Sequence, residues 1–233
     1  MMMDIFSSFD PHSTFFFSSL SQLSFWLLSF LSISFLIPSL WMTPSRLNLA
    51  LTQAHSTMNS QSSRTFNLHI KSNNWILTSL FLLIISFNLL GLLPYSFSVS
   101  SHLFMTLTLG LPLWLALILS ALMHAPKSLV AHLLPSGAPE WLNPFLVITE
   151  TLSIAVRFIT LSFRLAANMS AGHILLGLMG ITASASLFSS LPQFFMIISI
   201  QMGYLMFELG ICFIQAYIFC LLLSLYSDDH PSS

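Results

Sequence analysis

The sequence predicts an all-α integral membrane protein, and three observations support this fold class. The chain is 55% hydrophobic and only 6% charged, whereas soluble domains are about 25% charged. Its apolar residues form runs long enough to cross a bilayer core of about 30 Å. Polar side chains within the last runs recur at helical spacing. The net charge of −1, with six Lys and Arg residues, argues against a nucleic-acid-binding surface.

The first elements are a short tail, one membrane span and a polar loop. The tail, residues 1–14, contains no Lys or Arg, so it resembles neither a secretory signal nor a transit peptide. Residues 15–37 are long enough for the first transmembrane helix, which Pro38 ends. Residues 38–74 are polar and predict a loop outside the membrane, part of which can form an amphipathic helix on its surface.

Residues 75–123 predict a helical hairpin. Two apolar runs, Trp75–Leu93 and His102–Met123, are joined by a short uncharged turn, so two neighbouring antiparallel spans are expected. Residues 124–144 follow and contain four prolines, which predicts a second loop.

Residues 145–226 predict two long, strongly tilted helices packed as a hairpin, followed by a tail at 227–233. As a helix, residues 145–190 would be about 69 Å long, roughly twice the bilayer core. This element must therefore be tilted, bent, or broken near Gly172, Gly177 or Gly180. Residues 192–226 are also too long to stand upright.

The positive charges predict the orientation of the spans. All Lys and Arg outside the apolar runs lie in residues 38–74 and 124–144, which five spans would place on one side of the membrane. The positive-inside rule makes this the inner side. The N-terminus is then outside and the C-terminus inside. Glu150 enters the membrane from the inner side, and His173 lies toward the outer side.

A polar stripe is expected along the first long helix. Its members recur at steps of three or four, which places them on one narrow face: Glu150, Ser153, Arg157, Thr160, Arg164 and Asn168. We expect this face to be buried, although one charge at the bilayer centre costs about 2.5–3.5 kcal/mol. Ala167 and Ala171 beside it would let another helix approach closely. A working polar track that faces a closely approaching neighbour is one reading.

The alternative reading of the stripe is a ladder of structural ion pairs. Glu150 and Arg157 are about 10 Å apart along the helix axis, and we expect that they do not pair directly. The last helix repeats the pattern with Gln201, Glu208 and Gln215 at steps of seven. Glu208 is either a buried neutral carboxyl or a proton carrier.

His173 lies on roughly the opposite face from Arg164. It is either structural or part of an outer path near Glu208. Cys212 and Cys220 read as small apolar residues, because eight residues of helix separate them by about 12 Å, too far for a disulfide. The scattered His residues show no metal-binding spacing. We therefore expect no metal and no cofactor.

Three groups of segments resemble the a subunit of ATP synthase in its mitochondrial form. The resemblance runs in order from about Asn88 to Tyr226, more loosely through the first span, and is carried by Glu150–Ser153 with Phe163–His173, Asn88–Tyr95 with Pro112–Trp114, and Glu208–Phe219 with Leu225–Tyr226. One departure is Phe158, which follows Arg157 where the family usually has proline. This departure leaves the local bend of the long helix open.

The resemblance implies a proton-translocating subunit of F-type ATP synthase, with H⁺ as the transported ion. Two offset half-channels would load and unload protons on the carboxylates of the c-subunit ring. Arg164 would be the essential cation facing that ring. The outer half-channel would use His173, Glu208, Asn168 and Gln215. The inner one would use Glu150, with Arg157, Ser153 and Gln201 in supporting roles.

The resemblance also implies partners and a location. The partners are the c-subunit ring, the peripheral-stalk and other F0 subunits, and the lipid bilayer. The chain would bind no nucleotide and would not be an enzyme on its own. It would lie in the mitochondrial inner membrane, with its N-terminus in the intermembrane space and its C-terminus in the matrix. The alternatives are a secondary transporter, which usually shows an internal repeat that we do not find here, and a structural subunit of a respiratory complex.

Overall fold

The computed structural model describes residues 9, 30, 46–64, 73–93, 98–133 and 140–228. Within these ranges the regular elements are all helical: α2 (Arg46–Ser62), α3 (Asn73–Gly91), η5 (Val99–Ser101), α4 (Leu103–His124), α5 (Pro126–His132), η6 (Glu140–Leu142), α6 (Asn143–Ser189) and α7 (Leu191–Asp228). Four of these helices, α3, α4, α6 and α7, are long and apolar enough to cross a membrane. The prediction of an all-α membrane protein is therefore confirmed.

Most of the predicted first span, residues 15–37, lies outside the described residues. Phe30 is the exception. It is helical, and its ring packs edge-on against Phe87 of α3, with 5.7 Å between ring centroids. The N-terminal tail apart from Phe9, and residues 229–233, also lie outside the described part of the chain.

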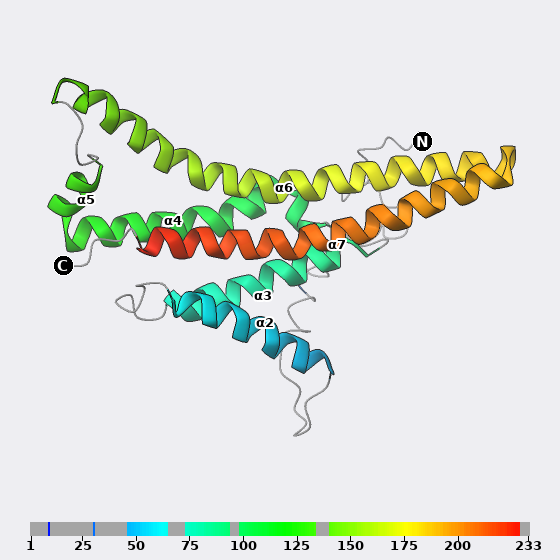
Figure 1. The fold of residues 1–233 in the computed structure, drawn as a ribbon, viewed down its shortest axis with the longest axis horizontal. Helices are drawn as coiled ribbons and strands as arrows, with labels where there is room; N and C mark the ends of the chain where they lie inside the picture. Colours follow the sequence, from blue (N-terminus) through cyan, green and yellow to red (C-terminus); the bar gives the residue numbers. More distant parts are fainter. Residues whose placement is uncertain are drawn as a thin grey trace, which may run out of the picture.

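The hydrophobic core surrounds the C-terminal half of α7. This helix contacts α3, α4 and α6, while α2 packs on the far side of α3 (Figure 1). Ala216 and Cys220 of α7 are fully buried at 0% exposure. The fully packed cluster around them draws side chains from α2, α3, α6 and α7: Met58, Leu77, Leu80, Phe81, Ile84, Leu161, Leu165, Ala216, Phe219, Cys220 and Leu223. This core fixes α6 and α7 relative to each other.

The long helix α6 is continuous, so the prediction of a break near its glycines, one of three alternatives, is wrong. Figure 1 shows one curved helix across the whole molecule. A glycine within a helix costs only about 0.8–1.0 kcal/mol relative to alanine, which a helix of 47 residues absorbs. Phe158, where the resemblance predicts proline, stacks on Trp114 of α4 with 4.5 Å between ring centroids. The helix therefore passes through this point unbroken and packed against α4.

The turn between α6 and α7 is a single residue. Ser190 has an extended backbone, with φ −161° and ψ 127°, which reverses the chain. Pro192 then stands in the first turn of α7, where a missing backbone N–H costs little. The two helices run antiparallel and together extend beyond the other helices (Figure 1). At the opposite end the start of α6 diverges from the end of α7.

Both predicted loops contain helix. α2 lies within residues 38–74 and is tied to α3 by Asn74, whose amide donates to the Asn59 side chain over 2.7 Å. Asn74 also accepts a hydrogen bond from Ser62. The prediction of a plain loop at residues 124–144 is wrong in part. Pro126 occupies the first turn of α5, a position where the fixed φ of proline favours helix.

Candidate functional site

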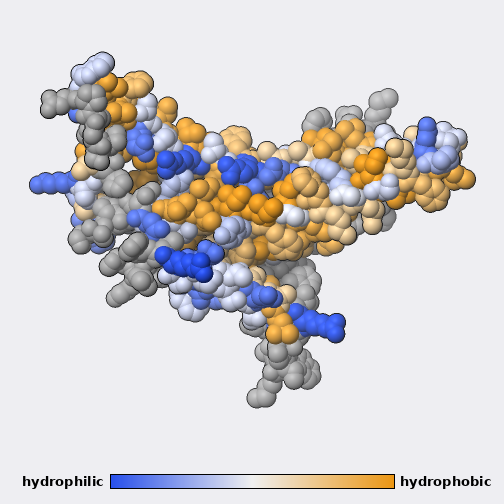
Figure 2. Space-filling view, viewed as in Figure 1, coloured by the Kyte–Doolittle hydropathy of each residue, from blue (hydrophilic) through white to orange (hydrophobic). Residues whose placement is uncertain are grey.

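The polar stripe of α6 lies on the open surface of the chain. Arg157, Thr160, Arg164 and Asn168 are exposed, and hydrophilic atoms follow the middle of α6 between hydrophobic surfaces (Figure 2). The sequence predicts a membrane-buried face that meets a neighbour, and the described residues of this chain leave that face uncovered. Hydropathy and spacing indicate that a face avoids lipid, but they do not tell whether its own chain or another chain covers it. The stripe is available to a partner.

Two members of the stripe pair with each other, contrary to the sequence-based expectation. Arg157 Nη2 lies 3.9 Å from Glu150 Oε1, because both long side chains extend along the helix toward one another. Arg157 also lies over the ring of Tyr226 in α7, 5.9 Å from its centroid. Both ionic side chains are nearly half exposed, so the pair contributes little to stability.

Arg164 is left outside this pair. In the described part of the chain it has no hydrogen bond and no ion pair. Ala167 and Ala171, both exposed, follow it along α6, and their small side chains leave room for another helix beside it. A lone guanidinium between apolar surfaces needs an anion, and this side chain is open to receive one from outside the chain.

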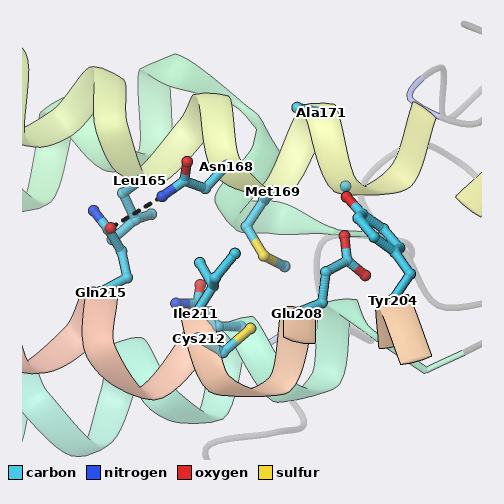
Figure 3. Close-up of a pocket in the computed structure, with 11 residues that line it drawn as sticks. Leu165, Asn168, Met169, Ala171, Tyr204, Glu208, Ile211, Cys212 and Gln215 are labelled. Atoms are coloured by element: carbon cyan, nitrogen blue, oxygen red, sulfur yellow. Dashed lines mark hydrogen bonds between the residues drawn. The ribbon is translucent and has the colours of Figure 1, made fainter. Parts of the chain in front are cut away.

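Asn168 joins the stripe to the interior. Its Nδ2 donates a hydrogen bond to Gln215 Oε1 of α7 over 3.1 Å, drawn as the dashed line in Figure 3. Gln215 is only 4% exposed, whereas Asn168 is exposed. Asn168 and Gln215, which were predicted to belong to one proton path, are therefore in direct contact.

A cavity of about 120 Å³ lies behind this contact, between α3, α6 and α7. It is large enough for several waters. Its polar lining includes Glu208, which is 6% exposed and whose Oε2 has no hydrogen-bond partner among the described residues. Figure 3 shows the Glu208 carboxyl directed toward α6, next to Tyr204. The full lining is Asn88, Leu165, Asn168, Met169, Ala171, Gly172, Tyr204, Glu208, Ile211, Cys212 and Gln215.

Gly172 permits the closest approach of α6 to Glu208. A Cβ added to Gly172 would overlap Glu208 Oε1 and lie 2.8 Å from Glu208 Cδ. Only glycine leaves room for the carboxyl in this place. Gly172 is therefore needed for close packing at the site. It does not break the helix, which was one of the alternatives that the sequence allowed.

His173 follows Gly172 but does not line the cavity. Its ring lies close to the backbone of Gly91 at the end of α3 and packs edge-on against Phe9, with 6.1 Å between ring centroids. Its Nε2 is buried without a partner in the described part of the chain. We expected His173 near Glu208, but His173 does not border the cavity that Glu208 lines.

The supporting residues of the prediction lie apart from the cavity. Ser153 donates to the Glu150 backbone carbonyl over 2.9 Å, and Gln201 is partly exposed on α7. Sequence reasoning missed Asn88 as a lining residue. The signal for Asn88 is an amide near the end of α3, a span made mostly of apolar residues. Across the described ranges, no three His, Cys, Asp or Glu side chains cluster as metal ligands.

Comparison with known proteins identifies the family. A family model described as ATP synthase A chain matches residues 19–228. The chain belongs to this family. It is 42% identical over 233 residues to ATP synthase subunit a of Albinaria caerulea, covering 99% of this chain and 100% of that protein. Identity is 37% over 229 residues with subunit a of Artemia franciscana, with 98% and 100% covered. Family membership makes the chain a non-catalytic, proton-translocating subunit of the F0 complex, which it forms with other ATP synthase subunits.

Proposed function

We propose that this chain forms two offset half-channels that load and unload protons on the carboxylates of a c-subunit ring, coupling proton flow to ring rotation and ATP synthesis. The observation that carries the proposal is the position of Arg164. It is exposed on α6 without a partner among the described residues, and one turn further Asn168 bonds to Gln215 at the Glu208 cavity. On this proposal, α6 carries both the residue that attracts the ring carboxylate, Arg164, and, one turn further, the residue where the outer proton route ends, Asn168.

The proposed role of Arg164 follows from its chemistry. A guanidinium stays protonated at any accessible pH, so it attracts a passing ring carboxylate in its ionised form. The same fixed charge opposes a proton that would cross directly between the half-channels. The small side chains of Ala167 and Ala171 allow a ring helix to come close. An ion-pair ladder explains Glu150 and Arg157 but leaves Arg164 without a role.

In the outer half-channel, protons would pass His173 and Glu208 and reach the ring near Asn168 and Gln215. The two amides do not titrate, so their role is to position water and the ring carboxylate. In the inner half-channel, Glu150 would receive the released proton, with Arg157 paired to it. Ser153 and Gln201 stay supporting residues. The transported ion is H⁺, and no cofactor or nucleotide takes part on this chain.

The proposed location is the mitochondrial inner membrane, with the N-terminus in the intermembrane space and the C-terminus in the matrix. Both relatives are named ATP synthase subunit a, which supports a place in the ATP synthase complex. The positive charges of the two loops support the orientation. The c-subunit ring and the peripheral stalk are the proposed partners. The strong tilt of α6 and α7 belongs to this proposal, since α6 alone has 47 residues.

The direct test replaces Arg164 in the assembled ATP synthase. Arg164→Ala should abolish ATP synthesis driven by a proton gradient, and Arg164→Lys should remove most of it, because an ammonium lacks the planar fork of the guanidinium. Thr151→Ala is the control, since Thr151 is exposed on the same helix and its hydroxyl, within the described ranges, donates to the Ile148 carbonyl alone. Near-normal synthesis with Arg164→Ala would reject the assigned role.

A second test concerns the outer half-channel. Glu208→Gln keeps the shape of the side chain but removes its ability to take up and release a proton. ATP synthesis driven by an imposed gradient should fall, while assembly of the complex stays normal. An unchanged rate counts against Glu208 as a proton carrier.

A further inference from the structure

We propose that Asn88, in the last turn of α3, is a positioning residue of the proton route, whose amide holds water against the Glu208 carboxyl. The inference rests on the proposed function and extends it. It adds α3 as a third wall to a route otherwise formed by α6 and α7. It also gives the outer half-channel a link between His173 and Glu208.

Burying the Asn88 amide at this position costs free energy. It is 1% exposed in an apolar helix, and its Oδ1 has no partner among the described residues. A buried polar atom without a hydrogen bond costs about 1–3 kcal/mol, whereas an apolar residue of similar shape avoids that cost. A residue that served packing alone would be apolar here. The cost points to a partner that is not a protein atom.

The cavity supplies that partner. Asn88 borders the same 120 Å³ space as Glu208, and Glu208 Oε2 and Gln215 Nε2 are likewise buried without a protein partner in this part of the chain. A buried water needs two to four polar partners and little more than its own volume, and the residues around this cavity carry three buried polar atoms that lack a protein partner in the described part of the chain. The titratable groups that border the cavity, Tyr204, Glu208 and Cys212, all come from α7.

The same turn of α3 also lies beside His173. The imidazole is close to the backbone of Gly91, which follows Asn88 by three residues and so shares its helix face. Gly91 lies so close to α6 that an added Cβ would be 2.8 Å from Met169 Cε. His173 does not border the cavity. The last turn of α3 therefore lies beside His173 and also borders the cavity that Glu208 lines.

Asn88 cannot carry the proton itself, because an amide does not titrate near neutral pH. Its contribution is orientation. Water bound between the Asn88 amide and Glu208 would present a proton to the carboxyl from the α3 side. Removing the amide should leave the cavity in place but its water poorly oriented, which slows loading of Glu208.

The experiment uses the assembled ATP synthase, with rates normalised to assembled complex. Asn88→Leu should lower gradient-driven ATP synthesis about tenfold, equivalent to about 1.36 kcal/mol on the barrier. Asn88→Ser, which keeps a hydrogen-bonding group, should retain most of the rate. Ser86→Ala is the control on the same helix, because the Leu83 carbonyl is the one hydrogen-bond partner of the Ser86 hydroxyl among the described residues. If Asn88→Leu does not assemble, Asn88→Ala takes its place.

A second readout separates positioning from structure. With the inner pH fixed, slower loading of Glu208 should move the half-maximal rate of Asn88→Leu to a lower outer pH. A purely structural defect would scale the curve without moving it, and that result overturns the inference. So does a rate within twofold of the unsubstituted enzyme. Glu208→Gln is measured in parallel: if it slows synthesis while Asn88→Leu does not, only the role of Asn88 fails, and if neither does, the proposed outer half-channel fails.

Discussion

Replacing Gly172 with alanine tests whether the close approach of α6 positions the Glu208 carboxyl. The added methyl group would overlap Glu208 Oε1, so the carboxyl must leave its present place. Leaving a preferred side-chain torsion costs about 0.5–1.5 kcal/mol. Alanine gains about 0.5–1 kcal/mol over glycine in a helix interior. These terms nearly cancel, so the complex should assemble normally with its carboxyl displaced.

The assay is ATP synthesis by the reconstituted complex under an imposed proton gradient. A misplacement of about 1 Å in a reacting group can cost about a hundredfold in rate, and we expect Gly172→Ala to lose between tenfold and a hundredfold. Gly177→Ala is a matched control on the same helix, because nothing lies within 4 Å of its added Cβ. It should retain the full rate.

Equal rates for Gly172→Ala and Gly177→Ala would refute the reasoning. They would mean that Glu208 works from another position, or that the contact at Gly172 has no part in the proton route. Loss of the assembled complex with Gly172→Ala alone would also contradict it, because the calculation predicts nearly unchanged stability.

Three further predictions concern contacts within the chain. Asn168→Ala leaves the buried Gln215 Oε1 without its 3.1 Å donor, so the double variant with Gln215→Ala should show a coupling energy above about 0.5 kcal/mol in synthesis rate; additive effects would argue against a shared step. Arg157→Gln breaks a half-exposed pair and should change resistance to thermal inactivation by less than about 1 kcal/mol; a larger loss would show that a partner buries the pair. Phe219→Ala, at a core residue 1% exposed, should cost about 3–5 kcal/mol and deplete the assembled complex in native gels; normal amounts would place the core elsewhere.

Much of the fold could be predicted from the sequence because long apolar runs leave few alternatives. Spans that begin near Trp75, His102 and Phe145 appear as α3, α4 and α6, with ends that differ by a few residues. The continuity of α6 could not be predicted in this way. Glycine is compatible with both a helix and a break, and packing against α4 and α7 decides between them.

For the candidate site, spacing predicted which residues share a face but not what covers that face. Glu150, Arg157 and Arg164 do lie along one side of α6, yet the side is open, and two of the three pair with each other. The contact between Asn168 and Gln215 joins residues 47 apart in sequence, which periodicity within one helix cannot reveal. Asn88 was missed for the same reason, since its importance depends on a cavity shared with two other helices.

Cysteine cross-linking tests the central claim most directly. The account holds that the face of α6 that carries Arg164 meets the ring carboxylate. Ala167 is exposed on that helix, whereas its neighbour Ala166 is 6% exposed, and the native Cys212 and Cys220 are buried. With a cysteine introduced beside the carboxylate of the c subunit, Ala167→Cys should form a disulfide with the ring and Ala166→Cys should not. A ring that cross-links to neither position, or only to Ala166→Cys, would contradict the account.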